Sequence, residues 1–139
     1  MNPVRHYPLA IIVATLCYFG LGAVWFTLFR SAWLEGIGRT MEQLQTSGVS
    51  PALAYCVALG LTLALALFLS WLIQATGPAT VARGIQVAVI LWFCVVFSTC
   101  ATEYAFEARG VRTLAIVSGY PLVGMVLMGA VLGGWNKRS

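Results

Sequence analysis

From Pro51 to Ala75 the chain reads PALAYCVALGLTLALALFLSWLIQA, an apolar segment without a charged residue. An α-helix rises ~1.5 Å per residue, so a helix over this segment can cross a hydrocarbon core of ~30 Å. Ser50 is a favoured N-cap residue, and proline is favoured at the first helical position. Gly77-Pro78 ends the helical pattern. The segment therefore predicts a transmembrane helix.

Three further apolar segments predict transmembrane helices over residues 8–29, 84–108 and 113–135. The first is too long for a signal peptide, and no Ala-x-Ala site follows it, so we expect it to be retained. We therefore expect an all-α polytopic membrane protein, with residues 1–139 forming a single four-helix transmembrane domain.

The longest connection, residues 30–50, carries signals for a short helix. Its first part either continues the first helix or lies along the interface, and Gly36 and Gly38 end it. Thr40-Met-Glu-Gln43 has the spacing of a capping box, which predicts a short helix to about Gln45. We expect an interfacial helix between the first and second transmembrane helices.

Composition points to the lipid bilayer as the surrounding of this chain. It is 60% hydrophobic and 9% charged, whereas soluble domains are about a quarter charged. The net charge of +4 comes from cations spread over termini and loops, so no basic stripe exists for nucleic-acid binding. The cysteines lie in apolar segments without a Cys-x-x-Cys pair, and the only histidine is His6. We expect no metal site and no cofactor.

The distribution of lysine and arginine does not predict an orientation in the membrane, because each side of the predicted topology carries four of the eight cationic residues. The two sets are Arg5, Arg83, Lys137 and Arg138 against Arg30, Arg39, Arg109 and Arg112. Four spans place both termini on one side, and the glutamates all fall on the other. We expect cytoplasmic termini in a bacterial cytoplasmic (inner) membrane, with dual insertion and an antiparallel dimer as alternatives.

Small residues recur on two of the predicted helices, where they let a neighbouring backbone approach closely. They are Ala54, Ala58, Thr62, Ala66 and Ser70 in the second helix, and Gly129 and Gly133 in the fourth. The first set favours packing within the chain, with an oligomer contact as the alternative. The glycine pair has the spacing of a dimerisation motif. Pro121 removes one backbone donor from the fourth helix and predicts a kink.

Two of the four acidic residues, Glu103 and Glu107, lie one helical turn apart near the end of the third apolar segment. Carboxylates near hydrocarbon are costly and often functional, and like charges at this spacing repel. Arg30, Arg109 or a bound cation would compensate them. One interpretation is an ion pair of Arg30 with either glutamate, which pins the first and third helices together. The other is a proton- or cation-responsive site.

Positions along the helices place a set of polar and aromatic residues near the side of the two charged loops. The candidate pocket consists of Trp25, Tyr55, Thr99, Thr102, Glu103 and Tyr120. An aromatic belt with interfacial charges would produce the same pattern. A pocket that opens toward this side of the membrane is the functional alternative.

Several motifs occur in an order that resembles a known bacterial family. They are Gly20-Leu-Gly-Ala-Val-Trp25-Phe26, Ala32-Trp33-Leu34, Gly36-Ile-Gly38, Tyr104-Ala-Phe106-Glu107-Ala-Arg109, Gly119-Tyr120 and Gly129-Ala-Val-Leu-Gly133-Gly-Trp135. The chain resembles, over nearly its whole length, the family named domain of unknown function 1761. This resemblance implies a compact four-helix membrane protein and brings no established activity. Glu103 stands where a neutral asparagine is expected, and Pro121 where a polar residue is expected.

The sequence leaves two functions open. The favoured one is a non-enzymatic helix-packing, accessory or partner-binding subunit, which contacts other membrane proteins or forms a homo-oligomer. The alternative is a small oligomeric proton- or cation-coupled transporter centred on Glu103. An enzyme is not favoured, because the sequence has no nucleophile–base pairing, metal cluster or phosphate-binding loop.

Overall fold

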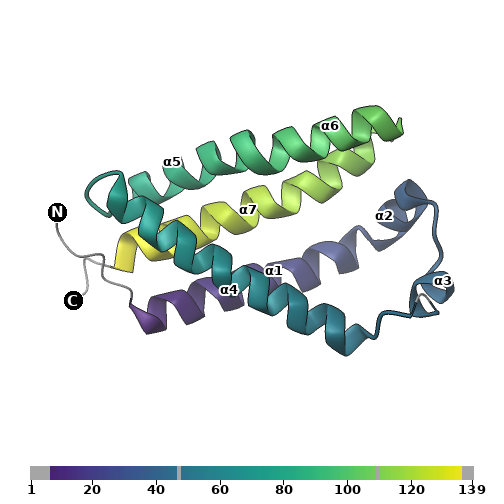
Figure 1. Cartoon of the computed structure of the whole chain (residues 1–139), viewed down its shortest axis with the longest axis horizontal. Helices are drawn as coiled ribbons and strands as arrows, with labels where there is room; N and C mark the ends of the chain where they lie inside the picture. The colour runs from purple at the N-terminus through teal and green to yellow at the C-terminus, as the bar shows by residue number, and fades with distance from the viewer. Residues whose placement is uncertain (1–6, 47, 109, 136–139) are drawn as a thin grey trace.

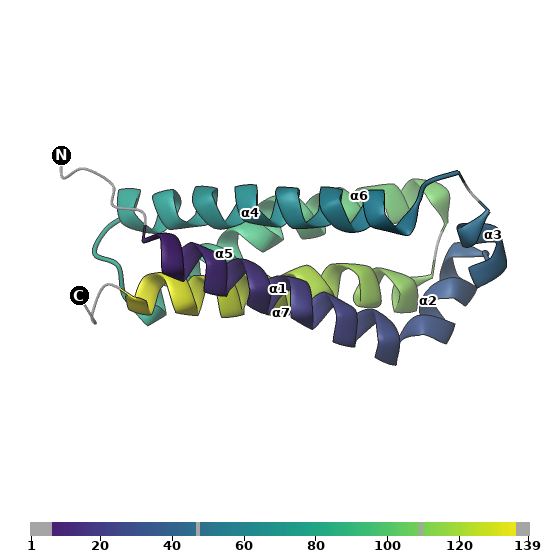
Figure 2. The ribbon, with the colours of Figure 1, turned by 90° about the horizontal axis from the view of Figure 1, so that it is seen from below.

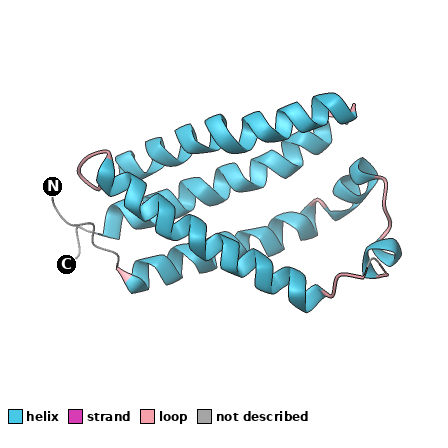
Figure 3. Ribbon diagram, in the orientation of Figure 1, coloured by secondary structure: helices cyan, strands magenta, loops and turns pink. Residues whose placement is uncertain are grey.

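A computed structural model shows an all-helical bundle and describes residues 7–46, 48–108 and 110–135 (Figure 1). In chain order the elements are α1 (Pro8–Leu28), α2 (Arg30–Ile37), α3 (Met41–Gln45), α4 (Pro51–Ala75), α5 (Val81–Leu91), the π-helix η1 (Trp92–Phe97), α6 (Ser98–Glu107) and α7 (Val111–Trp135). No strand occurs in these ranges (Figure 3). The all-α prediction is confirmed.

Four helical stretches are long and apolar enough to cross a membrane, as predicted. They are Pro8–Leu28, Pro51–Ala75, Val81–Glu107 and Val111–Trp135. The third consists of α5, η1 and α6, which follow one another directly. It begins at Val81 instead of residue 84, because the Thr80 side chain caps it by accepting a hydrogen bond from the Arg83 N–H at 3.1 Å.

The connection between the first two spans contains two short helices instead of one. Phe29 interrupts the helical backbone between α1 and α2, and α2 ends at Gly38, whose φ of 69° is left-handed. The predicted capping box then starts α3. The Thr40 side chain accepts from the Gln43 N–H at 3.2 Å, and the Gln43 side chain accepts from the Thr40 N–H at 3.0 Å.

The end of the third span differs from the sequence prediction. The helix ends at Glu107, and Ala108 takes the left-handed conformation with φ 53°. Glycine is the usual residue at such a helix end, and Gly110, which the sequence would offer for this role, lies beyond the turn. The left-handed conformation is sterically unfavourable for alanine because of its Cβ atom, whereas glycine adopts it without this cost.

Close backbone contact holds α5 against α7. A Cβ atom on Gly84 would overlap the carbonyl group of Gly129, and one on Gly133 would overlap the Thr80 carbonyl. Gly129 and Gly133 therefore lie in a contact within this chain. Glycine is required here because the backbones meet directly.

Aromatic rings fill the contact between α1 and α7. The Tyr18 ring lies on Gly124, and a Cβ on that glycine would be 2.6 Å from the ring. Likewise, Tyr120 of α7 lies on Gly22 of α1, and its hydroxyl oxygen would be 2.6 Å from a Cβ on that glycine. The two tyrosine rings also contact each other, with centroids 5.0 Å apart. Each tyrosine ring thus fits against a glycine of the other helix, in space that a larger side chain would fill.

Two tryptophans donate hydrogen bonds to α7 just before Pro121. Trp25 Nε1 donates to the Ile116 carbonyl at 3.0 Å, and Trp92 Nε1 donates to the Ser118 carbonyl at 2.8 Å. Pro121 lacks the N–H that would donate to the Val117 carbonyl, and the two tryptophans bond to the carbonyls on either side of that one. The helix continues through Pro121 from Val111 to Trp135.

The remaining core lies where α1 begins and α4 ends. Ala10 and Ala14 of α1 are buried there together with Ala66 and Leu69 of α4. Small side chains allow the two helices to approach at this end. Toward α2 and α3 the same helices diverge (Figure 2).

Candidate functional site

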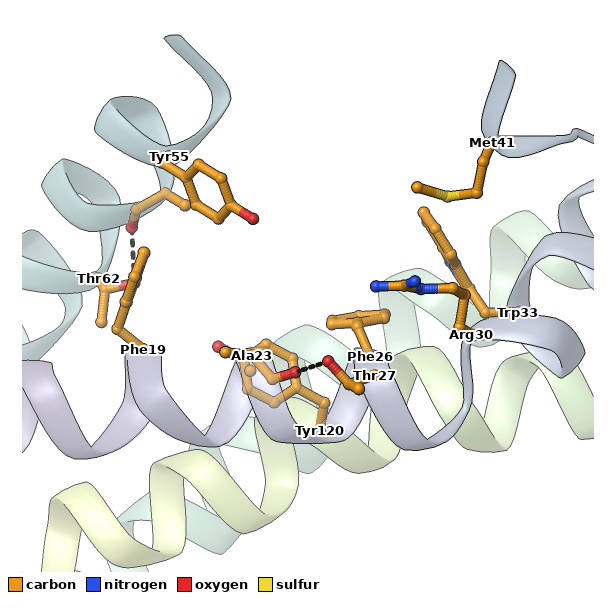
Figure 4. Close-up of a pocket in the computed structure, with 12 residues that line it drawn as sticks. Phe19, Ala23, Phe26, Thr27, Arg30, Trp33, Met41, Tyr55, Thr62 and Tyr120 are labelled. Atoms are coloured by element: carbon orange, nitrogen blue, oxygen red, sulfur yellow. Dashed lines mark hydrogen bonds between the residues drawn. The ribbon is translucent and has the colours of Figure 1, made fainter. Parts of the chain in front are cut away.

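The divergence of α1 and α4 leaves a pocket of about 380 Å³ between them (Figure 4). Its walls come from α1 and α4, the start of α2 and α3 close one end, and Tyr120 of α7 reaches it from behind. The lining residues are Phe19, Gly22, Ala23, Phe26, Thr27, Arg30, Trp33, Met41, Tyr55, Ala58, Thr62 and Tyr120. Aromatic and small apolar side chains therefore dominate it.

The floor is built around Tyr120. Its hydroxyl donates to the Tyr18 carbonyl at 3.1 Å, which fixes the ring across the face of α1. Phe26 packs edge-on against the same ring with centroids 5.4 Å apart. Gly22 makes room for the tyrosine, so the pocket floor depends on the packing between α1 and α7.

The opposite wall is the exposed first half of α4. Tyr55 is 63% exposed and contacts Phe19 edge-on at a centroid distance of 6.0 Å. Ala58 is also exposed, and its small side chain lines the pocket. The pocket is consequently open along the face between the two helices.

Few polar groups of the pocket are available to a ligand. Thr27 Oγ1 donates to the Ala23 carbonyl at 2.6 Å, and Thr62 Oγ1 donates to the Ala58 carbonyl at 2.6 Å. The Tyr55 hydroxyl forms no hydrogen bond with any described residue. Its oxygen and the guanidinium of Arg30 point into the same open space from opposite sides (Figure 4).

Arg30 lies where α1 gives way to α2, with Trp33 and Met41 beside it (Figure 4). Trp33 packs against Phe26 at a centroid distance of 5.4 Å, which supports this end of the pocket. None of the lining residues is acidic. The pocket thus has an apolar interior and a cationic rim.

The structure brings together only part of the predicted pocket. Tyr55 and Tyr120 line the cavity, whereas Trp25 packs behind it through its hydrogen bond to α7. The other members lie exposed on α6, away from the cavity; they are Thr99, Thr102 and Glu103. Each threonine hydroxyl there donates to the carbonyl four residues earlier in the same span, at 2.6 and 2.7 Å.

Arg30 and the two glutamates are placed on different parts of the bundle. Arg30 faces the pocket between α1 and α4, while Glu103 and Glu107 lie on α6, which continues η1 and packs against α7. No ion pair joins Arg30 to either glutamate within the described ranges. Arg109, the other predicted partner, lies outside the described residues.

The small-residue stripe of α4 divides between the core and the pocket. Thr62, Ala66 and Ser70 are buried, and Ala54 and Ala58 are exposed. The change occurs where α4 leaves α1, and Ala58 and Thr62 at this point of the stripe line the pocket.

Several pocket residues were missed by the sequence analysis. Phe19, Phe26, Trp33 and Met41 were not assigned to a site, although the lining residues of α1 recur at three- or four-residue spacing, which marks one helix face. Depth alone could not identify them. The three- and four-residue spacing could have identified this face of α1. Only the position of α4 in the structure shows that α4 does not cover it.

Comparison with known proteins identifies the family of this chain. No curated protein and no solved structure matches the chain. Residues 9–133 match the family described as "Protein of unknown function (DUF1761)". The match covers all four spans, including the α1 and α4 segments that form the pocket. The chain therefore belongs to the family of proteins of unknown function DUF1761.

Proposed function

We propose that this chain is a non-enzymatic binding protein of the membrane, which holds a hydrophobic molecule in the pocket between α1 and α4. The observation that carries the proposal is the uncovered aromatic pocket of about 380 Å³. Ligand pockets in proteins span about 300–1,000 Å³ and are mostly apolar with a few placed polar groups. The role is accessory in the sense that binding, and not turnover, is the activity.

The chemistry of the lining favours binding over catalysis. The pocket contains no carboxylate, thiol or imidazole among its lining residues. Its threonine hydroxyls already donate to backbone carbonyls, so no base is placed to activate them. Arginine stays protonated and is a poor general base.

Filling the pocket tests this proposal. The protein is placed in phosphatidylcholine nanodiscs with a photoreactive long-chain alcohol, and labelled peptides are mapped by mass spectrometry. We expect labelling of the pocket face of α1 that unlabelled alcohol competes away. Ala58→Phe should abolish this saturable labelling, because the new ring occupies the cavity from the α4 wall.

Ala64→Phe is the matched control, because Ala64 is exposed on the same helix and does not line the pocket. It should keep the saturable labelling. Labelling that is spread evenly over all lipid-facing helices, or that both variants leave unchanged, would refute the proposed binding site.

A transporter centred on Glu103 is the second candidate, and the presence of a carboxylate within the third apolar span supports it. The exposure of Glu103 and its absence from the pocket lining weigh against it. Proton-linked solute flux in liposomes distinguishes the two functions. A flux that Glu103→Gln abolishes, in a protein that remains folded, would establish the carrier.

We further propose the bacterial cytoplasmic membrane as the location, with both termini on the cytoplasmic side. The start of α1 and the end of α7 lie at the same end of the bundle, which supports a common side (Figure 1). Association with a second copy or with another membrane protein would use the lipid-facing surfaces of the spans.

A further inference from the structure

We infer that the pocket selects an amphiphile with one alkyl chain and an anionic head group, with Arg30 and Tyr55 holding the head. The inference rests on the proposed binding function and names its ligand class. It follows from the order of polar and apolar groups along the cavity.

The polar groups gather at one end of the cavity. Arg30 lies two residues beyond the end of the first span at Leu28, and Tyr55 lies in the first turns of α4, which begins at Pro51. Both positions correspond to a membrane–water interface, where arginine and tyrosine are favoured. Their polar ends point into the same space (Figure 4).

The apolar groups lie further along both helices. Phe19 lies well inside α1, and Thr62 lies well inside α4 with its hydroxyl bonded to its own helix. Tyr120, whose hydroxyl is also bonded, covers the floor between them. A ligand in this cavity therefore meets hydrogen-bond donors at the interface and hydrocarbon-like surface below it.

The charge of the rim determines the sign of the head group. Arg30 has no acidic partner among the described residues, and no carboxylate lines the cavity. A guanidinium presents a planar set of N–H donors that matches a carboxylate, and the Tyr55 hydroxyl adds one donor. An anionic head would complete this set, whereas a cationic head would be repelled.

The volume limits the number of chains. One methylene occupies about as much space as one water molecule, so about 380 Å³ holds roughly a dozen such groups. The enclosed part of the cavity therefore accommodates one alkyl chain, and a second chain would lie outside its lining. A single-chain carboxylate is the ligand that satisfies volume, charge and polarity together.

Two photoreactive probes that differ only in the head group test the inference. A long-chain carboxylate and the corresponding alcohol are compared in phosphatidylcholine nanodiscs at alkaline pH, where the carboxylate is ionised. We expect Arg30→Gln to weaken saturable binding of the carboxylate roughly tenfold, about 1.4 kcal/mol, and to leave the alcohol unchanged. Arg30→Lys should retain most of the binding, because it keeps the charge.

Arg39→Gln is the matched control, because Arg39 is an exposed arginine in the same connection and does not line the pocket. It should leave both probes unchanged. Equal carboxylate binding by the wild type and Arg30→Gln would overturn the inference, and Arg30 would then be an interfacial residue that reaches the head groups. Competition by a two-chain anionic phospholipid as strong as that by the single-chain carboxylate would also overturn it. If neither probe labels the pocket saturably, the proposed binding function itself fails.

Discussion

Replacing Gly84 with alanine tests the close contact between α5 and α7. The new Cβ would lie 2.7 Å from the Gly129 carbonyl carbon, although ordinary contacts of this kind begin at 3.4 Å. The obstacle is backbone, so no side chain can rotate away, and the helices must separate. Overpacking of this kind costs about 1–3 kcal/mol, while the helix gains about 0.5–1 kcal/mol from losing a glycine. We expect a net destabilisation of about 1–2 kcal/mol.

Unfolding in mixed micelles with increasing sodium dodecyl sulfate, followed by tryptophan fluorescence, measures this free energy. Gly60→Ala is the matched control, because Gly60 also lies in a transmembrane helix and nothing lies within 4 Å of a Cβ there. Gly60→Ala should leave the free energy of unfolding unchanged or raise it slightly. If the Gly84 variant is as stable as the Gly60 variant, the two backbones do not meet as described.

Three further predictions concern local features of the chain. Trp25→Phe removes the hydrogen bond to α7 and should cost about 1 kcal/mol in the same unfolding assay, whereas Trp71→Phe at an exposed site should change stability by less than about 0.5 kcal/mol. Ala108→Gly should raise the free energy of unfolding by about 1 kcal/mol, because it relieves a left-handed alanine, and an unchanged value would contradict that strain. Reporter fusions after Gln45 and Lys137 should report opposite sides of the membrane, and the same side for both would refute the four-span topology.

The features that could be predicted from the sequence are those that depend on short stretches of chain. The Ser50 cap forms as expected, with its side chain accepting from the Leu53 N–H at 3.1 Å, and the Thr40 capping box forms as well. Apolar length alone identified the four spans. In each case the interacting groups are separated by only a few residues, so the sequence contains the whole interaction.

The features that could not be predicted depend on how each helix is rotated about its axis. Glu103 and Tyr120 were assigned to one site because they share a depth, but the first lies exposed on α6 and the second faces the pocket. The π-helix from Trp92 to Phe97 gave no pattern distinct from an α-helix. Arg30 was expected to form an ion pair with a glutamate. In the structure α4 diverges from α1, and Arg30 lines the resulting cavity instead.

The divergence of α4 from α1 also determines the route by which a molecule reaches the pocket. Ala58 lines the open side and lies further inside a helix that is long and apolar enough to span the membrane, so below the interfacial Tyr55 this side would face lipid. A ligand of the proposed site would enter sideways from the bilayer. The fraction of occupied pockets then depends on the mole fraction of the ligand in the lipid. An apparent dissociation constant expressed as a concentration in solution will therefore change with the amount of membrane in the sample.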